Sequence, residues 1–225
     1  MTLIELTVVL LILIALAGLA IPYVGGTNRM VLCQATDASM QAIKTAVMGG
    51  GANSGFYMDT LGFYPQNTRN TQDHNDYSLR YLFEPTSGWN TYNPKTAVGW
   101  RGPYLMSGGR IPSGLGSSFS SVYHPSTNTS GTVHTNISTD DGSHAMDAWG
   151  RPIILQIPYD SVTSTYLVDN ARLVSAGPGN GLEPDSAAVN TAIHNNENAS
   201  DRSDDRVLYL KIPDPLLGGN QPCNN

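Results

Sequence analysis

The apolar residues of the chain are concentrated in one long run near its N-terminus. Residues 6–24, LTVVLLILIALAGLAIPYV, include no charged side chain, and Glu5 stands directly before them. A helix needs roughly 20 apolar residues, at about 1.5 Å per residue, to cross a bilayer. The pattern therefore predicts that residues 1–24 form an apolar helix that serves as a membrane anchor.

A cleavable secretory signal is the main alternative for such a run. A signal of that kind carries basic residues ahead of its apolar region, whereas the first basic residue of this chain is Arg29. The small residues of the ALAGLA segment resemble a cleavage site, but the basic region that should precede them is missing. We expect the segment to stay on the protein.

A second helical pattern follows the apolar run and ends at the glycines of positions 49–51. Thr27 or Asn28 can cap its start. The two patterns together predict one long helix in two parts, with local melting around Gly18, Pro22, Gly25 and Gly26. Residues 25–50 are thus expected to form an amphipathic continuation. Its apolar positions at helical spacing are Val31, Ala35, Ala38, Ala42, Ile43, Ala46 and Val47.

The remaining residues, 51–225, are expected to form one globular, β-rich head. The Tyr and Phe residues of the loop 51–69 should fold back onto the helix, and residues 77–84 read as a short helix. Short β-prone runs at 153–157, 166–168, 172–175 and 207–210 predict a small antiparallel sheet. The polar stretch 113–141 predicts a surface excursion. The fold class is therefore α+β, a long N-terminal helix packed on a small sheet.

Composition narrows the possible roles of this head. The chain has 225 residues, 40% hydrophobic and 13% charged, with a net charge of -6 and a pI near 5.2. This acidic balance argues against a nucleic-acid-binding surface.

The two cysteines, Cys33 and Cys223, lie near opposite ends of the chain. A disulfide between them would stabilise the folded protein by about 4–5 kcal/mol in the chain-entropy model. Two buried free thiols are the alternative.

We find no convincing catalytic or metal-binding motif. The histidines show neither the HExxH spacing of zinc proteases nor a GxSxG serine nearby. The most metal-like group by composition is Asp140, Asp141, His144 and Asp147, but its spacing matches no known metal loop, and a solvated loop before a turn explains it better. We predict that the protein is not an enzyme.

The N-terminal run TLIELTVVLLILIALAGLAIP resembles the mature N-terminus of bacterial type IV pilins and type II secretion pseudopilins. Pro22 falls where pilins carry a helix-breaking proline, whereas Met1 departs from their usual Phe. The resemblance implies that a prepilin peptidase cuts before Met1 and methylates its amine. It also implies a ladle-shaped subunit that packs into a helical homopolymer through this helix.

The head carries its own resemblance. The segments WRGPYL, DAWGRPI, ARLVSAGPGNG and DDRVLYL occur in that order and are similar to the head of the major pseudopilin of type II secretion. Additional sequence lies at 108–143 and 182–202. Such heads hold calcium between the two last segments, so the resemblance places a Ca²⁺ site at Asp204 and Asp205. In the alternative reading these carboxylates cap a strand or pair with Arg202 or Arg206.

Glu5 has a physical role in such an assembly. An ionised carboxylate carried into a low-dielectric helix bundle costs several kcal/mol unless it is paired. In a stack of identical helices, the Glu5 carboxylate of one copy can meet the Met1 amine of its neighbour and so fix the register. Otherwise Glu5 lies among lipid headgroups.

The sequence thus predicts a structural subunit of an extracellular type IV pilus-like filament. Before assembly it would reside in the inner membrane, and its partners would be identical subunits together with the pilus or secretion assembly machinery. The first alternative is a major pseudopilin that forms a periplasmic pseudopilus. The remote alternative is a membrane-anchored periplasmic binding protein or hydrolase.

Overall fold

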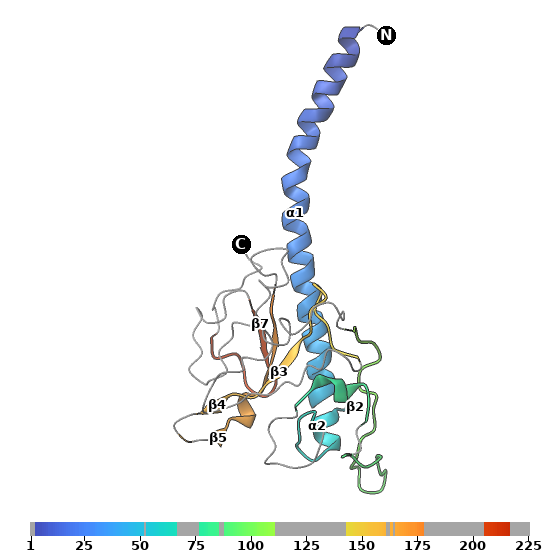
Figure 1. Cartoon of the computed structure of the whole chain (residues 1–225), viewed down its shortest axis with the longest axis vertical. Coiled ribbons are helices and arrows are strands. Elements are labelled where there is room, and N and C mark those ends of the chain that lie inside the picture. The colour runs from blue at the N-terminus through green and yellow to red at the C-terminus, as the bar shows by residue number, and fades with distance from the viewer. Residues whose placement is uncertain are drawn as a thin grey trace.

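The fold is a long helix with a small mixed head at its C-terminal half (Figure 1). The computed structural model describes residues 3–51, 53–66, 77–85, 88–110, 143–160, 163, 165–177 and 205–216, without the side chains of 16–28, 53 and 159. The described part combines helices with a small antiparallel sheet, as the sequence predicts. The polar stretch 113–141 lies outside the described residues.

Helix α1 (Leu3–Met48) is continuous, and Figure 1 shows its N-terminal half extending away from the head. The predicted local melting around Pro22 is therefore wrong, and the helix continues into residues 25–48 without a start at Thr27 or Asn28. A proline removes one backbone hydrogen bond and perturbs one turn, whereas the residues on both sides keep their own helical bonds. The predicted end is confirmed, because Gly49 follows Met48 with a φ of 90°.

The chain then turns back tightly onto the end of α1. The strands β1 (Gly49–Gly50) and β2 (Asn53–Ser54) pair antiparallel and lead into the short helix α2 (Phe56–Asp59). A Cβ atom on Gly55 would lie 2.2 Å from the backbone nitrogen of Gly49, so only glycine fits there. This turn brings Phe56 into the core with no exposed surface, which confirms that the aromatic segment folds back onto the helix.

The central sheet has the strand order β3-β6-β7 and is antiparallel throughout. Its strands are β3 (Ile154–Gln156), β6 (Arg172–Ser175) and β7 (Arg206–Tyr209), each within one residue of a predicted boundary. Every residue of β3 and β6 is buried. Since successive side chains of a strand point to opposite faces, both faces of the sheet are covered at β3 and β6, whereas three of the four residues of β7 are partly exposed.

Smaller elements complete the head. The predicted helix at 77–84 is a 3-10 helix, η2 (Leu79–Leu82), and Ser78 caps it by accepting a hydrogen bond from the Arg80 amide. The ribbon β4 (Tyr159–Asp160) and β5 (Thr165–Tyr166) precedes η4 (Val168–Asn170). The strand predicted at 166–168 is therefore largely wrong.

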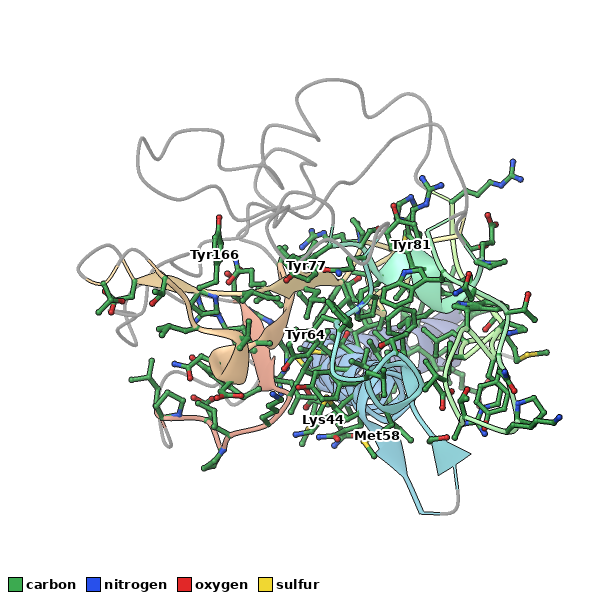
Figure 2. All side chains as sticks on the ribbon, turned by 90° about the horizontal axis from the view of Figure 1, so that it is seen from below. Lys44, Met58, Tyr64, Tyr77, Tyr81 and Tyr166 are labelled. Carbon is green, nitrogen blue, oxygen red and sulfur yellow. The ribbon has the colours of Figure 1, made fainter. Side chains whose placement is uncertain are left out.

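The core lies between α1, the sheet and the loops around η2. Met40, Ile43 and Val47 of α1 are at most 3% exposed and belong to one hydrophobic cluster with Leu155 and Leu173 of the sheet. Aromatic rings occupy much of the remaining space, as the view in Figure 2 shows around Tyr64, Tyr77 and Tyr81. The C-terminal half of α1 is thus an integral part of the head.

Candidate assembly surface

Residues 3–15 of α1 present an apolar surface with nothing from the described head packed on it. Ten large apolar side chains between residues 3 and 14 are each 51–84% exposed. Large exposed apolar patches on a monomer mark sites that contact another molecule or a membrane. The chain therefore requires a partner or an apolar environment here. These side chains are Leu3, Ile4, Leu6, Val8, Val9, Leu10, Leu11, Ile12, Leu13 and Ile14.

Glu5 lies in the first turn of α1, at the start of this apolar surface. A carboxylate near a helix N-terminus interacts favourably with the helix dipole. Met1, its predicted partner in a neighbouring copy, lies outside the described residues, and Pro22 lies within α1 without a described side chain. The predicted pairing of Glu5 with a terminal amine stays a prediction.

A search of the described residues for a membrane span finds no helix that is both long and apolar enough to cross a bilayer. Of the predicted span, residues 16–24 belong to the part of α1 whose side chains are not described.

Polar contacts fasten the head to the C-terminal half of α1. The Arg206 guanidinium of β7 binds the Asp37 carboxylate through two hydrogen bonds, one from Nε to Oδ1 at 2.7 Å. The Lys44 ammonium donates to the Tyr209 carbonyl at 2.7 Å, and the Ala148 amide donates to Thr36 Oγ1 at 3.1 Å. These contacts join residues more than a hundred positions apart, which is why no local sequence pattern could reveal them.

Asp147 has a structural role in the DAWG turn. Its Oδ1 accepts the amides of Trp149 and Arg151 at 2.9 and 2.8 Å, and its Oδ2 accepts the Ser175 hydroxyl at 2.8 Å. Burial raises the pKa of Asp147, although these donors act in the opposite direction. His144 is also buried, and Asp140 and Asp141 lie outside the described residues. The turn interpretation of Asp147 is thus confirmed.

The structure describes half of the predicted calcium pair. Asp205 directly precedes β7 and is 2% exposed, and Asp204 lies outside the described residues. Calcium takes 6–8 oxygen ligands, and among the described residues no three His, Cys, Asp or Glu side chains are grouped closely enough to hold a metal. The described residues alone do not form a calcium site, so Ca²⁺ stays a prediction.

Cys33 lies on the buried face of α1, where it is 2% exposed, and it is disulfide-bonded. Cys223 lies outside the described residues. No free cysteine occurs in the described part of the chain. The pairing of Cys33 with Cys223 stays a prediction, and unreduced mass spectrometry can test it directly.

An ion pair between a buried carboxylate and a partly exposed guanidinium, which the sequence pattern did not reveal, joins the loops beside α2. The Asp59 carboxylate accepts hydrogen bonds from Arg101 Nε at 3.0 Å, from Arg101 Nη2 at 2.7 Å and from the Tyr104 hydroxyl at 2.9 Å. Burial raises the pKa of Tyr104 well above its usual range, so its hydroxyl remains protonated and donates. The segment WRGPYL supplies both Arg101 and Tyr104, but no local sequence pattern relates it to Asp59, which lies more than 40 residues earlier.

Comparison of the chain with models of known protein families, with curated proteins and with solved structures finds no match.

Proposed function

We propose that the chain is a structural subunit that polymerises through α1 into an extracellular, type IV pilus-like filament. In this proposal the protein has the ladle shape of a pilin, with α1 in the filament core and the head at the surface. The single observation that carries the proposal is the exposed apolar segment 3–15 of α1, which lies beyond the head.

The energetics favour assembly over a solitary subunit. Fully burying a Leu, Ile or Val side chain is worth about 1.5–3 kcal/mol. Completing the burial of ten side chains that are 51–84% exposed therefore provides on the order of 10 kcal/mol per subunit. Identical helices packed together can supply this burial over their whole length, and the inner membrane would shelter the same surface before assembly.

The firm attachment of the head to α1 also suits a polymer. The Asp37–Arg206 ion pair and the buried residues of α1 join the head to the helix. When the helices pack together, the heads are therefore carried into defined positions around them. A periplasmic pseudopilus of a type II secretion system is the alternative, because it would use the same surfaces in another compartment.

The test is a charge-removal variant at the start of α1. We expect Glu5→Ala to leave the folded subunit intact and to reduce fibre yield at least tenfold, because only the polymer requires the charge to be paired within the helix bundle. Electron microscopy of sheared surface material measures fibre yield. Glu84→Ala, which removes an exposed carboxylate from the head, is the matched control and should assemble normally.

The filament proposal fails if wild-type cells carry fibres of this chain neither on their surface nor in their periplasm. Abundant normal fibres from Glu5→Ala would instead disprove the charge-pairing role and leave the filament in place. Fibres confined to the periplasm would favour the pseudopilus.

A further inference from the structure

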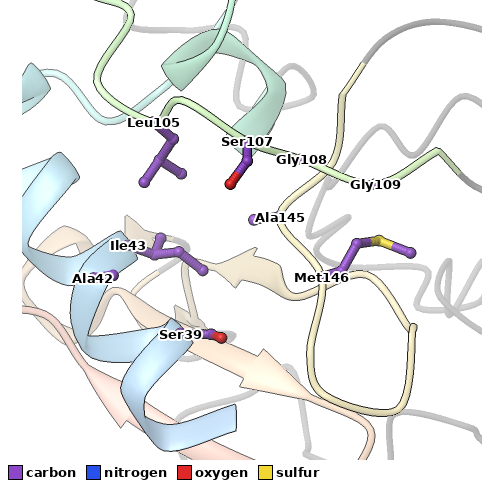
Figure 3. Close-up of a pocket in the computed structure, with 9 residues that line it drawn as sticks. All are labelled: Ser39, Ala42, Ile43, Leu105, Ser107, Gly108, Gly109, Ala145 and Met146. Carbon is purple, nitrogen blue, oxygen red and sulfur yellow. The ribbon is translucent and has the colours of Figure 1, made fainter. Parts of the chain in front are cut away.

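A groove runs along the C-terminal half of α1 on the surface of the head. Two adjacent cavities of 380 and 670 Å³ form it, and both are lined by Ala42 of α1 and Leu105 of the facing loop. Figure 3 shows Leu105 and Ile43 pointing toward each other across the smaller cavity. Because the cavities share lining residues on both sides, we treat them as one groove between α1 and residues 101–109.

The walls of the groove are mostly small or apolar. Ala42 and Ala46 keep the α1 side shallow, and Leu105, Met106 and Met146 supply apolar surface opposite or beside it. Met106 is 88% exposed, the largest exposure among the large apolar side chains of the described residues. Flexible methionines adapt their shape to apolar partners and are common at binding surfaces. The groove is therefore suited to Leu, Ile and Val side chains.

The same protein carries an apolar segment with just such side chains. Residues 3–15 of α1 are exposed along their whole length. They cannot reach the groove of their own chain, because α1 is continuous and Ser39, at the groove, lies 24 helical positions after Ala15, the last residue of the segment. At 1.5 Å per residue this separation is about 36 Å. Any contact between segment and groove must join two copies.

The charges at the two surfaces have opposite sign. Residues 3–15 carry a single formal charge, the Glu5 carboxylate. Arg101 lines the larger cavity, and its side chain is 41% exposed whereas that of its partner Asp59 is 3% exposed. The exposed member of this ion pair is the cation, so the charged group that faces solvent at this end of the groove is a guanidinium. A mildly acidic apolar helix is thus favoured over a basic one.

We propose that the groove between α1 and residues 101–109 receives the apolar segment 3–15 of α1 from a second copy of the chain. This inference rests on the proposed filament and identifies the head surface that contacts the helical core. Each subunit then supplies one apolar segment and one groove, which makes the contact heterologous and able to propagate along a filament.

Photo-crosslinking in assembled full-length protein tests the contact. The photoreactive residue p-benzoylphenylalanine replaces Met106 in one preparation and Met58 in a control preparation. Met58 is also an exposed methionine, 62% exposed, but it lies on α2 and does not line the groove. Each labelled subunit is co-assembled with isotopically heavy wild-type subunits and irradiated, and tryptic peptides are analysed by mass spectrometry.

We expect position 106 to cross-link to the heavy peptide 1–29, which trypsin releases intact because Arg29 is the first basic residue. Position 58 should not give this product, and detergent-dispersed subunits should give at least tenfold less. The groove proposal is wrong if fibres form and position 106 reacts only with head peptides, with a foreign protein or with nothing. The filament proposal is unaffected by that result. Failure to form fibres overturns both proposals.

A second variant tests the groove by filling it. Ala42 is exposed and borders both cavities, so Ala42→Trp should leave the unfolding midpoint unchanged and lower fibre yield at least tenfold. Gln41→Trp introduces the same indole side chain at the neighbouring exposed position, about 100° away around the helix, and should assemble as wild type. Normal fibres from Ala42→Trp would contradict the proposal.

Discussion

Removing either partner of the Asp59–Arg101 ion pair breaks the same salt bridge, yet the two losses of stability should differ in size. The carboxylate is buried, with its side chain 3% exposed, whereas the guanidinium side chain is 41% exposed. A charge left in the protein interior costs more than one that water can reach. We therefore predict that Arg101→Ala destabilises the head more than Asp59→Ala.

The magnitudes follow from what each variant leaves behind. Arg101→Ala leaves the Asp59 carboxylate buried with the Tyr104 hydroxyl as a donor, and loss of one partner of a buried pair costs about 3–5 kcal/mol. It also removes the guanidinium from the face of the Tyr92 ring, 4.7 Å from its centre. Asp59→Ala leaves an arginine that water can solvate, and we expect a loss of about 2 kcal/mol from its hydrogen bonds.

Urea unfolding of the full-length protein in detergent, followed by tryptophan fluorescence, measures both losses. Trp100 lies 5.9 Å from the Tyr104 ring and Trp89 lies 5.5 Å from Phe56, so the fluorescence reports on this region. In the double variant the buried carboxylate is gone, and its stability should approach that of Asp59→Ala. Equal losses, or a larger loss for Asp59→Ala, would refute the burial argument.

Three further predictions concern the turn, the cysteines and the metal. Asp147→Asn should stay within about 1 kcal/mol of wild type at pH 7 because Asn keeps an acceptor for the turn amides, whereas Asp147→Ala should lose about 2–3 kcal/mol. Burial raises the pKa of Asp147 above its ordinary value of 3.8, so the folded protein favours the protonated carboxyl. Stability should therefore fall as the pH rises from about 3.8 through the raised pKa. Asp147→Asn should abolish this pH dependence in unfolding curves. Mass spectrometry of unreduced subunits should show Cys33 joined to Cys223, and alkylation of both thiols in folded protein would contradict this. Calcium at 100 times its dissociation constant should add about 2.7 kcal/mol to the free energy of unfolding. Chelation should therefore lower the melting temperature by several degrees, and Asp204→Ala should remove this effect of the chelator. A melting temperature that chelation leaves unchanged would exclude the site.

Local patterns predicted the three strands of the central sheet well because turn-forming residues mark where these runs end. The run at 172–175 matches β6 residue for residue, and those at 153–157 and 207–210 match β3 and β7 within one residue. Gly or Pro follows each run within three residues, at Pro158, Gly177 and Pro213, and Asn170 or Asp205 stands within two residues before the second and third runs. The end of α1 at Met48 was likewise set by the following glycines.

Contacts between distant segments were beyond such reasoning. The row Gln156–Arg172–Tyr209 crosses all three strands in register, and the fully buried Arg172 donates to the Gln156 amide oxygen and the Tyr209 hydroxyl. A sequence pattern treats these polar residues as solvent-facing, since arginine is seldom buried without partners. Only the register of the folded sheet supplies the partners.

Of the two proposed contact surfaces, the apolar segment of α1 could be predicted from the sequence, whereas the groove could not. Glu5 and the apolar run are adjacent in sequence, so their composition alone identified them. The groove has one wall from α1 and another from residues 101–109, and its existence depends on how these segments pack. The sequence around Ala42 and around Met106 does not indicate that these two residues line the same groove.

The continuity of α1 has a mechanical consequence. A pull between the N-terminal segment and the head is borne by the backbone of one helix from Leu3 to Met48. Pro22 has no amide hydrogen to donate, and Gly25 and Gly26 lower helix propensity nearby, so this stretch should yield first under load. Each residue that unwinds lengthens from about 1.5 to 3.3 Å, and ten such residues would add about 18 Å. The subunit would then extend under tension while its head and its N-terminal contacts remain intact.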